Sequence, residues 1–196
     1  PRVRRQRQMC IRDRVNTMKI SVPRDAYKIK GMTSEAKHEI EAAINNLKKE
    51  YDIRLDLIEV AKMEVGDIFG AAPYLDDRGK LRFALVINED IDYNVVKKKI
   101  QRRYDKGRFA GKSIEDYIAH EMAHIMTYQD CKNEAEFRTR QRIVERQFMQ
   151  GISQYADKTG KGEESLAEAF VRYRNKEKIP IRAELLIRSY IERWKK

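Results

Sequence analysis

The sequence has little cysteine, little proline and no long hydrophobic run. Two cysteines among 196 residues exclude a scaffold held by disulfides and are typical of a reducing compartment. No segment has the roughly 18 to 20 consecutive apolar residues of a membrane span, and no apolar segment near the start has the pattern of a signal peptide. Four prolines and nine glycines form no linker, and no internal repeat divides the chain. We therefore expect one compact domain and no membrane partner.

The sequence has a marked excess of positive charge, and much of it lies at the start of the chain. The 42 lysines and arginines against 31 acidic residues give a net charge of +11, which alone would favour a nucleic-acid partner. Six arginines and one aspartate lie within residues 1–14, and without them the balance is 36 to 30, a net charge of +6. Because both signs are mixed over the rest of the chain, its charge predicts no nucleic-acid partner.

Residues 1–14 have a pattern of their own. The ten residues 4–13, RRQRQMCIRD, match the in-frame translation of a transposon adaptor used in sequencing libraries. We interpret residues 1–14 as an adaptor remnant outside the fold, with a reading frame that continues upstream. The alternative is a disordered basic arm. In either case Cys10 belongs to this segment, and the predicted domain is residues 15–196, with Cys131 as its thiol.

Hydrophobic periodicity predicts six helices in residues 15–196. Apolar residues three or four apart predict a first helix over residues 33–50, capped by Thr33 or Ser34. A second capping pattern opens a helix at Ser113. The other predicted helices cover residues 92–104, 134–150, 163–175 and 180–194, the last with Pro180 at its first position.

Strand patterns lie between the helices predicted over residues 33–50 and 92–104. Alternating apolar residues predict a strand over residues 53–60, and the segment LRFALVIN predicts a second strand over residues 81–88. A turn at residues 76–79 precedes the second strand, and Tyr74 and Leu75 before this turn predict a short partner strand. One helix, a small sheet and then a helical half together predict an α+β fold.

The clearest chemistry lies in HEMAH, in which His120 and Glu121 begin the motif and His124 ends it. A spacing of four residues in a helix places both imidazoles on one face, so that two ring nitrogens can bind one Zn²⁺. Glu121 is placed to accept a proton from metal-bound water. The alternative is a pair of surface histidines on an ordinary helix. The third histidine, His38, lies among acidic residues, and we expect it to be a solvated helix residue.

Two histidines make an incomplete site, because catalytic zinc usually has three protein ligands and a water. Asp130 stands six residues after His124, where one branch of the zincins has its third ligand. That branch needs glycine three residues after the second histidine, for a sharp turn, and Thr127 stands there. Cys131 could ligate as a thiolate, but a buried inert cysteine is the simpler interpretation.

Glu164 is the stronger candidate for the third ligand. Glu168 follows one turn later on the same helix face, which suits one carboxylate on the metal and a second that orients a ligand histidine. The alternative is an amphipathic helix whose acidic residues are solvated or pair with Arg172.

These motifs together resemble zincin metallopeptidases of the lethal-factor type, and also the peptidase-like C-terminal domain of phage head-morphogenesis (minor head) proteins. The matching stretches are HEMAH at 120–124, Tyr155-Ala156, and ESLAEAF at 164–170, so the resemblance begins near residue 110. It implies Glu164 as the third ligand, Glu168 as its outer partner, and Tyr155 facing the metal to stabilise an oxyanion. The interval between Tyr155 and Glu164 is longer than in that pattern, so an ordinary core or loop tyrosine stays an alternative.

The resemblance also implies a fold and a function. The fold would be zincin-like, with an N-terminal helix packed on a small mixed sheet, an active-site helix and a helical C-terminal half. The function would be zinc-dependent peptide hydrolysis with one Zn²⁺, on a peptide or protein substrate that pairs with an exposed strand, here residues 81–88. Phage structural proteins would be candidate partners, and the location would be the cytoplasm or a virion.

Two other functions are compatible with the sequence. The domain could be a non-catalytic phage head or assembly domain that keeps a structural zinc site. It could also bind nucleic acid through the cluster at residues 97–99 with Arg102 and Arg103, although a solvated helix face explains this cluster more simply.

Overall fold

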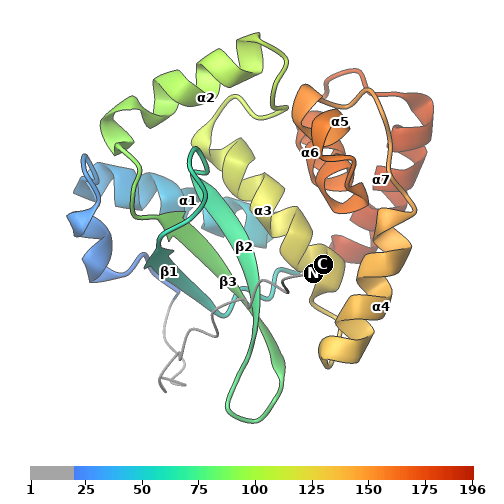
Figure 1. The fold of residues 1–196 in the computed structure, drawn as a ribbon, viewed down its shortest axis with the longest axis horizontal. Coiled ribbons are helices and arrows are strands. Elements are labelled where there is room, and N and C mark those ends of the chain that lie inside the picture. The colour runs from blue at the N-terminus through green and yellow to red at the C-terminus, as the bar shows by residue number, and fades with distance from the viewer. Residues whose placement is uncertain (1–19) are drawn as a thin grey trace, which may run out of the picture.

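The computed structural model describes residues 20–196, and the predicted adaptor remnant or basic arm at residues 1–14 lies outside the described residues. Within this part the fold is α+β, with seven α-helices and one three-stranded mixed sheet. Figure 1 shows the sheet and the first helices forming one half of the molecule, and the last four helices forming the other. None of the described helices is long and apolar enough to cross a membrane.

The first α-helix, α1 (Ser34–Glu50), follows a short 3-10 helix, η1 (Arg24–Lys28). The side-chain oxygen of Thr33 accepts a hydrogen bond from the Ala36 backbone N–H, which confirms the expected cap. The predicted periodicity is also confirmed, because the buried face of α1 consists of residues spaced by three or four: Ala36, Ile40, Ala43, Ile44 and Leu47.

The sheet has the strand order β1-β3-β2, with β1 (Leu57–Ala61) parallel to β3 (Leu81–Asn88) and β2 (Phe69–Leu75) antiparallel to it. The prediction that residues 81–88 form an exposed strand for substrate is wrong, because β3 is the central strand and both of its edges are paired. Among the described strands β2 is an edge strand, and Pro73 lies within it. Proline lacks an N–H and is tolerated on edge strands.

Two strand boundaries also differ from the prediction. The strand predicted over residues 53–60 begins at Leu57, because the Arg54 backbone N–H donates to the Gln129 side chain and not to a neighbouring strand. The partner strand predicted at residues 74–75 is the seven-residue β2, since pairing with β3 begins already at Phe69.

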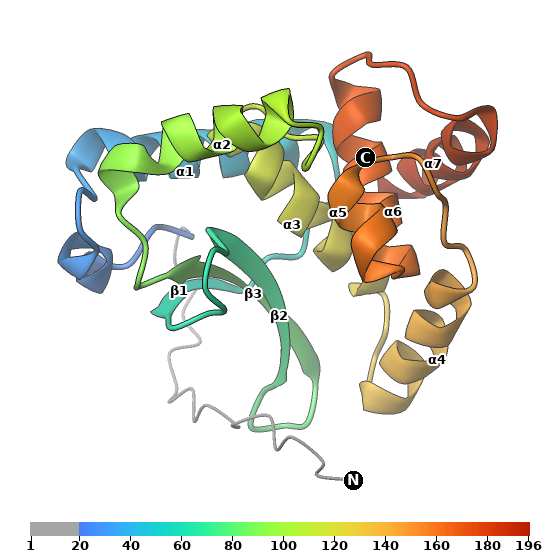
Figure 2. The ribbon, with the colours of Figure 1, turned by 45° about the horizontal axis from the view of Figure 1, so that its top comes forward.

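Two helices follow the sheet. Helix α2 (Val96–Asp105) continues from a 3-10 turn, η2 (Tyr93–Val95), and runs along the outside of the molecule beside α1 (Figure 2). Helix α3 (Ile114–Tyr128) is capped by Ser113, as expected. It packs against α1, β2 and α6, so it lies between the two halves and is buried on most sides.

The helical half consists of α4 (Glu134–Glu145), α5 (Gln154–Thr159), α6 (Gly162–Arg174) and α7 (Ile181–Trp194). Helix α4 ends five residues before the predicted boundary at residue 150, and α5 was not predicted. The backbone of Gly162 lies against the Val144 carbonyl, at the end of α4. Pro180 is the residue before α7 and not its first helical residue.

Candidate metal centre

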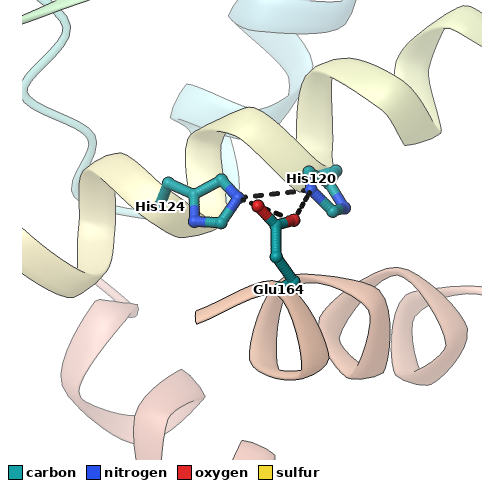
Figure 3. Close-up of side chains that lie close together, drawn as sticks. All are labelled: His120, His124 and Glu164. Atoms are coloured by element: carbon teal, nitrogen blue, oxygen red, sulfur yellow. Dashed lines mark hydrogen bonds and ion pairs between the residues drawn. The ribbon is translucent and has the colours of Figure 1, made fainter. Parts of the chain in front are cut away.

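Helices α3 and α6 bring three side chains to one point. Figure 3 shows His120 and His124 on one face of α3, with Glu164 of α6 opposite them. The His120 Nε2 atom lies 3.1 Å from Glu164 Oε2 and 3.2 Å from His124 Nε2. The distance from His124 Nε2 to the same Glu164 oxygen is 3.6 Å. Among the described residues these three form the group of His, Cys, Asp and Glu side chains that could hold a metal ion.

The separations between the three candidate ligand atoms fit a zinc ion. Ligand atoms at about 2.0 to 2.2 Å from a tetrahedral zinc are roughly 3.3 to 3.6 Å from one another. The three observed separations of 3.1, 3.2 and 3.6 Å are close to these values. Two imidazoles and one carboxylate are also a donor set that zinc prefers in catalytic sites, with the fourth position left open.

Glu168 fixes the orientation of one candidate ligand. Its side chain is 1% exposed, and Oε1 lies 2.9 Å from His120 Nδ1. Its other oxygen accepts a hydrogen bond of 2.8 Å from the Ala110 backbone N–H. A carboxylate at Nδ1 keeps the proton on that nitrogen, so that the Nε2 lone pair is directed toward His124 and Glu164.

The charged groups within the cluster shift one another's pKa values. Burial alone would raise the pKa of Glu164, but its hydrogen bonds with His120 and His124 hold that pKa well below the ordinary value. Burial would lower the pKa of both histidines, but the hydrogen bonds and charges of the surrounding carboxylates together outweigh it and raise both pKa values, with Glu168 acting on His120 in addition to Glu164. A cation that binds this group therefore competes with protons for the histidine nitrogens.

Glu121 lies between the metal-binding group and the edge strand. Burial raises the pKa of its carboxyl, and the neighbouring charges of His120 and His124 act in the opposite direction. A hydrogen bond from the backbone of Ala71 in β2 also lowers this pKa. The general base predicted from the sequence therefore lies next to both the candidate metal ligands and the strand edge.

Tyr155, at the start of α5, is part of a stack of aromatic rings beside the ligands. Its ring lies on Phe109 with the centroids 4.3 Å apart, and the other neighbour of Phe109 is Tyr117, at 5.4 Å. The Tyr155 ring is 6.3 Å from the His120 ring. Burial raises the pKa of Tyr155, and the charges of Glu164 and Glu121 add to this effect. A raised pKa favours the protonated phenol, which is a hydrogen-bond donor.

Three residues considered from the sequence lie outside the cluster. Asp130 is exposed and forms an ion pair with Arg54, with 3.4 Å between Oδ1 and the guanidinium nitrogen. Cys131 is buried and free, and burial raises the pKa of its thiol. His38 is exposed, and its Nδ1 lies 2.8 Å from the Ser34 carbonyl oxygen. The structure thus gathers Glu164, and not Asp130, with the two histidines.

Sequence reasoning missed two neighbours of the site. Phe109 follows the turn after α2 and shows no pattern of its own, yet its ring lies 6.3 Å from that of His120. Asp67, in the loop between β1 and β2, lies within electrostatic reach of Glu164 and Arg103. No sequence signal marks either residue, because both reach the site through the tertiary packing of loops.

The candidate site is therefore defined by its own geometry. No protein-family model, curated protein or solved structure matches this chain.

Proposed function

We propose that the protein is a zinc-dependent metallopeptidase of the zincin type. The observation that carries the proposal is the convergence of His120, His124 and Glu164 at the separations expected for tetrahedral zinc ligands. The resemblance of HEMAH and ESLAEAF to zincins of the lethal-factor type agrees with this geometry. A structural zinc site is normally closed by four protein ligands, whereas three ligands leave a position for water, so the donor set favours catalysis.

In this proposal His120, His124 and Glu164 hold the ion, and Glu168 keeps His120 in the required orientation. A zinc ion at this position supplies Lewis-acid polarisation of water and of the scissile carbonyl. Glu121 accepts the proton of the attacking water and passes it to the leaving amine. The Tyr155 phenol donates a hydrogen bond to the developing oxyanion.

The edge strand β2 is the place where an extended substrate pairs. Its Ala71 backbone contacts Glu121, so a peptide added along this edge passes directly over the general base. Peptide or protein segments without stable structure are therefore the proposed substrates. The resemblance to phage head-morphogenesis proteins makes phage structural proteins candidate substrates and partners.

The test combines zinc content with hydrolysis of denatured casein by the full chain. We expect one zinc per chain, and we expect Glu121→Gln to keep this zinc while hydrolysis falls by about 10² to 10⁴-fold, the usual contribution of a general base. Asp130→Ala is the control for zinc content and should retain it. A protein that binds one zinc but whose slow hydrolysis is the same with Glu121→Gln would instead be a non-catalytic assembly domain with a structural metal.

A further inference from the structure

Helix α2 has a one-sided distribution of charge. Val96 and Ile100 are its buried residues. On one flank its polar groups are paired within the protein: Lys97 forms an ion pair with Glu39 at 3.0 Å, and Gln101 donates to Asp105. The opposite flank and the loop that continues it carry cations, which we call the α2 cationic stripe: Lys98, Lys99, Arg102, Arg103, Lys106 and Arg108.

Most of the α2 cationic stripe is available to a partner. Lys98, Arg102, Lys106 and Arg108 are exposed, and none of them forms an ion pair with a residue that the structure describes. Arg103 is held in place instead, since its guanidinium donates to the Gly66 carbonyl at 2.8 Å. The stripe is therefore an exposed row of positive charge in which one inner cation, Arg103, is fixed.

This fixed cation lies beside the candidate active site. The Arg103 guanidinium lies 5.4 Å from the centroid of the Phe109 ring, and Phe109 stacks on Tyr155. The Arg108 carbonyl accepts a hydrogen bond of 2.9 Å from the Tyr155 backbone N–H. Figures 1 and 2 show the segment after α2 passing beside α5 before it enters α3. The stripe thus passes within one aromatic ring of the candidate metal ligands, and its other cations lie along α2 and the loop that follows it.

We propose that the α2 cationic stripe binds an acidic segment of the polypeptide substrate while the scissile bond lies at the metal centre. This inference rests on the proposed peptidase function and adds a substrate class to it. The ten residues of α2 span about 15 Å. An extended peptide covers this length with about four or five residues. A cluster of glutamates or aspartates of that length, on one side of the cleavage site, is the matching feature.

An acidic peptide fits the stripe better than a nucleic acid does. Proteins that bind single strands combine cations with exposed aromatic rings on which bases stack. The aromatic residues next to the stripe are already occupied: Tyr104 donates to Glu177 at 2.8 Å, and Phe109 lies between Tyr117 and Tyr155. Positive charge without a stacking surface favours carboxylates on a flexible chain.

The test is a binding measurement that does not need catalysis. A fluorescein-labelled peptide with five consecutive glutamates is titrated with the full chain, with and without zinc, and followed by anisotropy at 50 and 200 mM salt. We expect Arg102→Glu/Lys106→Glu to weaken binding about tenfold, because each exposed charge pair contributes modestly and reversal adds repulsion. Arg182→Glu/Lys195→Glu, with Arg182 on α7 and Lys195 directly after it, makes the same change in net charge and should bind like the wild type. Arg102→Gln/Lys106→Gln should weaken peptide binding several-fold. This variant is the control for unfolding of α2, because it removes the two charges without reversing them.

Two results would overturn the inference. One is equal binding by wild type and both stripe variants, and the other is tighter binding of a single-stranded oligonucleotide of equal charge than of the peptide. Because the peptide is also titrated without zinc, failure of the proposed peptidase function would show separately, as absence of zinc uptake or hydrolysis while the stripe still binds the peptide.

Discussion

At the scale of single residues, Glu168 connects the candidate ligands to the rest of the fold. One of its oxygens contacts the His120 imidazole and the other accepts from the backbone of Ala110, which follows Phe109. The same carboxylate therefore orients a candidate ligand and fixes the loop that carries the aromatic stack. A side chain with both roles must be fully buried, and only 1% of Glu168 is exposed.

We expect Glu168→Gln to lower zinc affinity by about 10 to 100-fold, since the amide no longer favours the required His120 tautomer. Isothermal titration with zinc measures this change. Glu163→Gln is the matched control on the same helix, because Glu163 accepts from Tyr128 and contacts no ligand. Equal losses of affinity in the two variants would contradict the orienting role.

Phe109 offers a second prediction at this scale. If its ring acts by holding Tyr155, the two residues are coupled, and Phe109→Leu should lower the turnover number in the wild type but have little further effect in Tyr155→Phe. The measurement is a double-mutant cycle on kcat for casein hydrolysis, with zinc content as the control. Additive losses would mean that Phe109 acts independently of the tyrosine.

At the scale of elements, the close contact between α4 and α6 depends on a glycine. A Cβ atom at Gly162 would lie 2.0 Å from the Val144 carbonyl oxygen, and this neighbour is backbone that cannot move aside cheaply. Because α6 carries both Glu164 and Glu168, a shift of its first turn would also displace the candidate ligand.

We therefore expect Gly162→Ala to lower the free energy of unfolding by about 3 kcal/mol or more, as overpacking against rigid atoms does. Urea unfolding followed by circular dichroism measures it. Gly160→Ala, two residues earlier, is the control: it has a positive φ of 65° but nothing within 4 Å of the added Cβ, so it should cost about 1 kcal/mol. Similar values for both would show that α6 can shift without cost.

Local sequence patterns explain which elements the sequence predicts. Helix α1 is predicted closely because its buried residues recur with the helical period. Strand β3 is predicted closely because it is a short, mostly apolar run after a turn, and it is buried at nearly every position. Strand β2 was largely missed, since its FGAAPYL sequence is poor in β-branched residues and becomes a strand through pairing with β3. Helix α5 has six residues and was missed because so short a segment shows no period.

The candidate site was predicted to a different degree for each residue. The fixed spacing of HEMAH placed His120 and His124 on one helix face, as local geometry requires. Glu164 lies 44 residues from His120, and no local rule joins such positions, so its prediction depended on the pairing with Glu168 on one helix face and on a family resemblance. Phe109 has neither a motif nor a period, and tertiary packing alone places it beside Tyr155.

At the scale of the whole molecule, the candidate metal centre joins the two halves. His120 and His124 lie on α3, which packs against α1 and β2, whereas Glu164 belongs to the helical half. A bound metal would close a loop of 44 residues, counted from His120 to Glu164. By analogy with a covalent cross-link, closing a loop of this length contributes up to about 4 kcal/mol through the entropy of the unfolded chain.

Removal of zinc should therefore destabilise the protein as a whole. We expect a chelator to lower the melting temperature of the zinc-loaded wild type by several degrees, measured by calorimetry at fixed protein concentration. Glu164→Ala should have a melting temperature below that of the zinc-loaded wild type, and the chelator should not change it. A wild-type melting temperature that is unchanged by chelation would contradict a metal link between the halves.

The proline in the edge strand has a consequence for self-association. An open strand edge can pair with the same edge of another copy and so begin aggregation. Pro73 has no N–H in the middle of β2, and the Ala71 backbone already donates a hydrogen bond to Glu121, so a continuous strand-to-strand ladder is interrupted at both positions. Two copies of β2 therefore cannot form an unbroken ladder along its length, and an extended segment that pairs with this edge must do so beside Glu121.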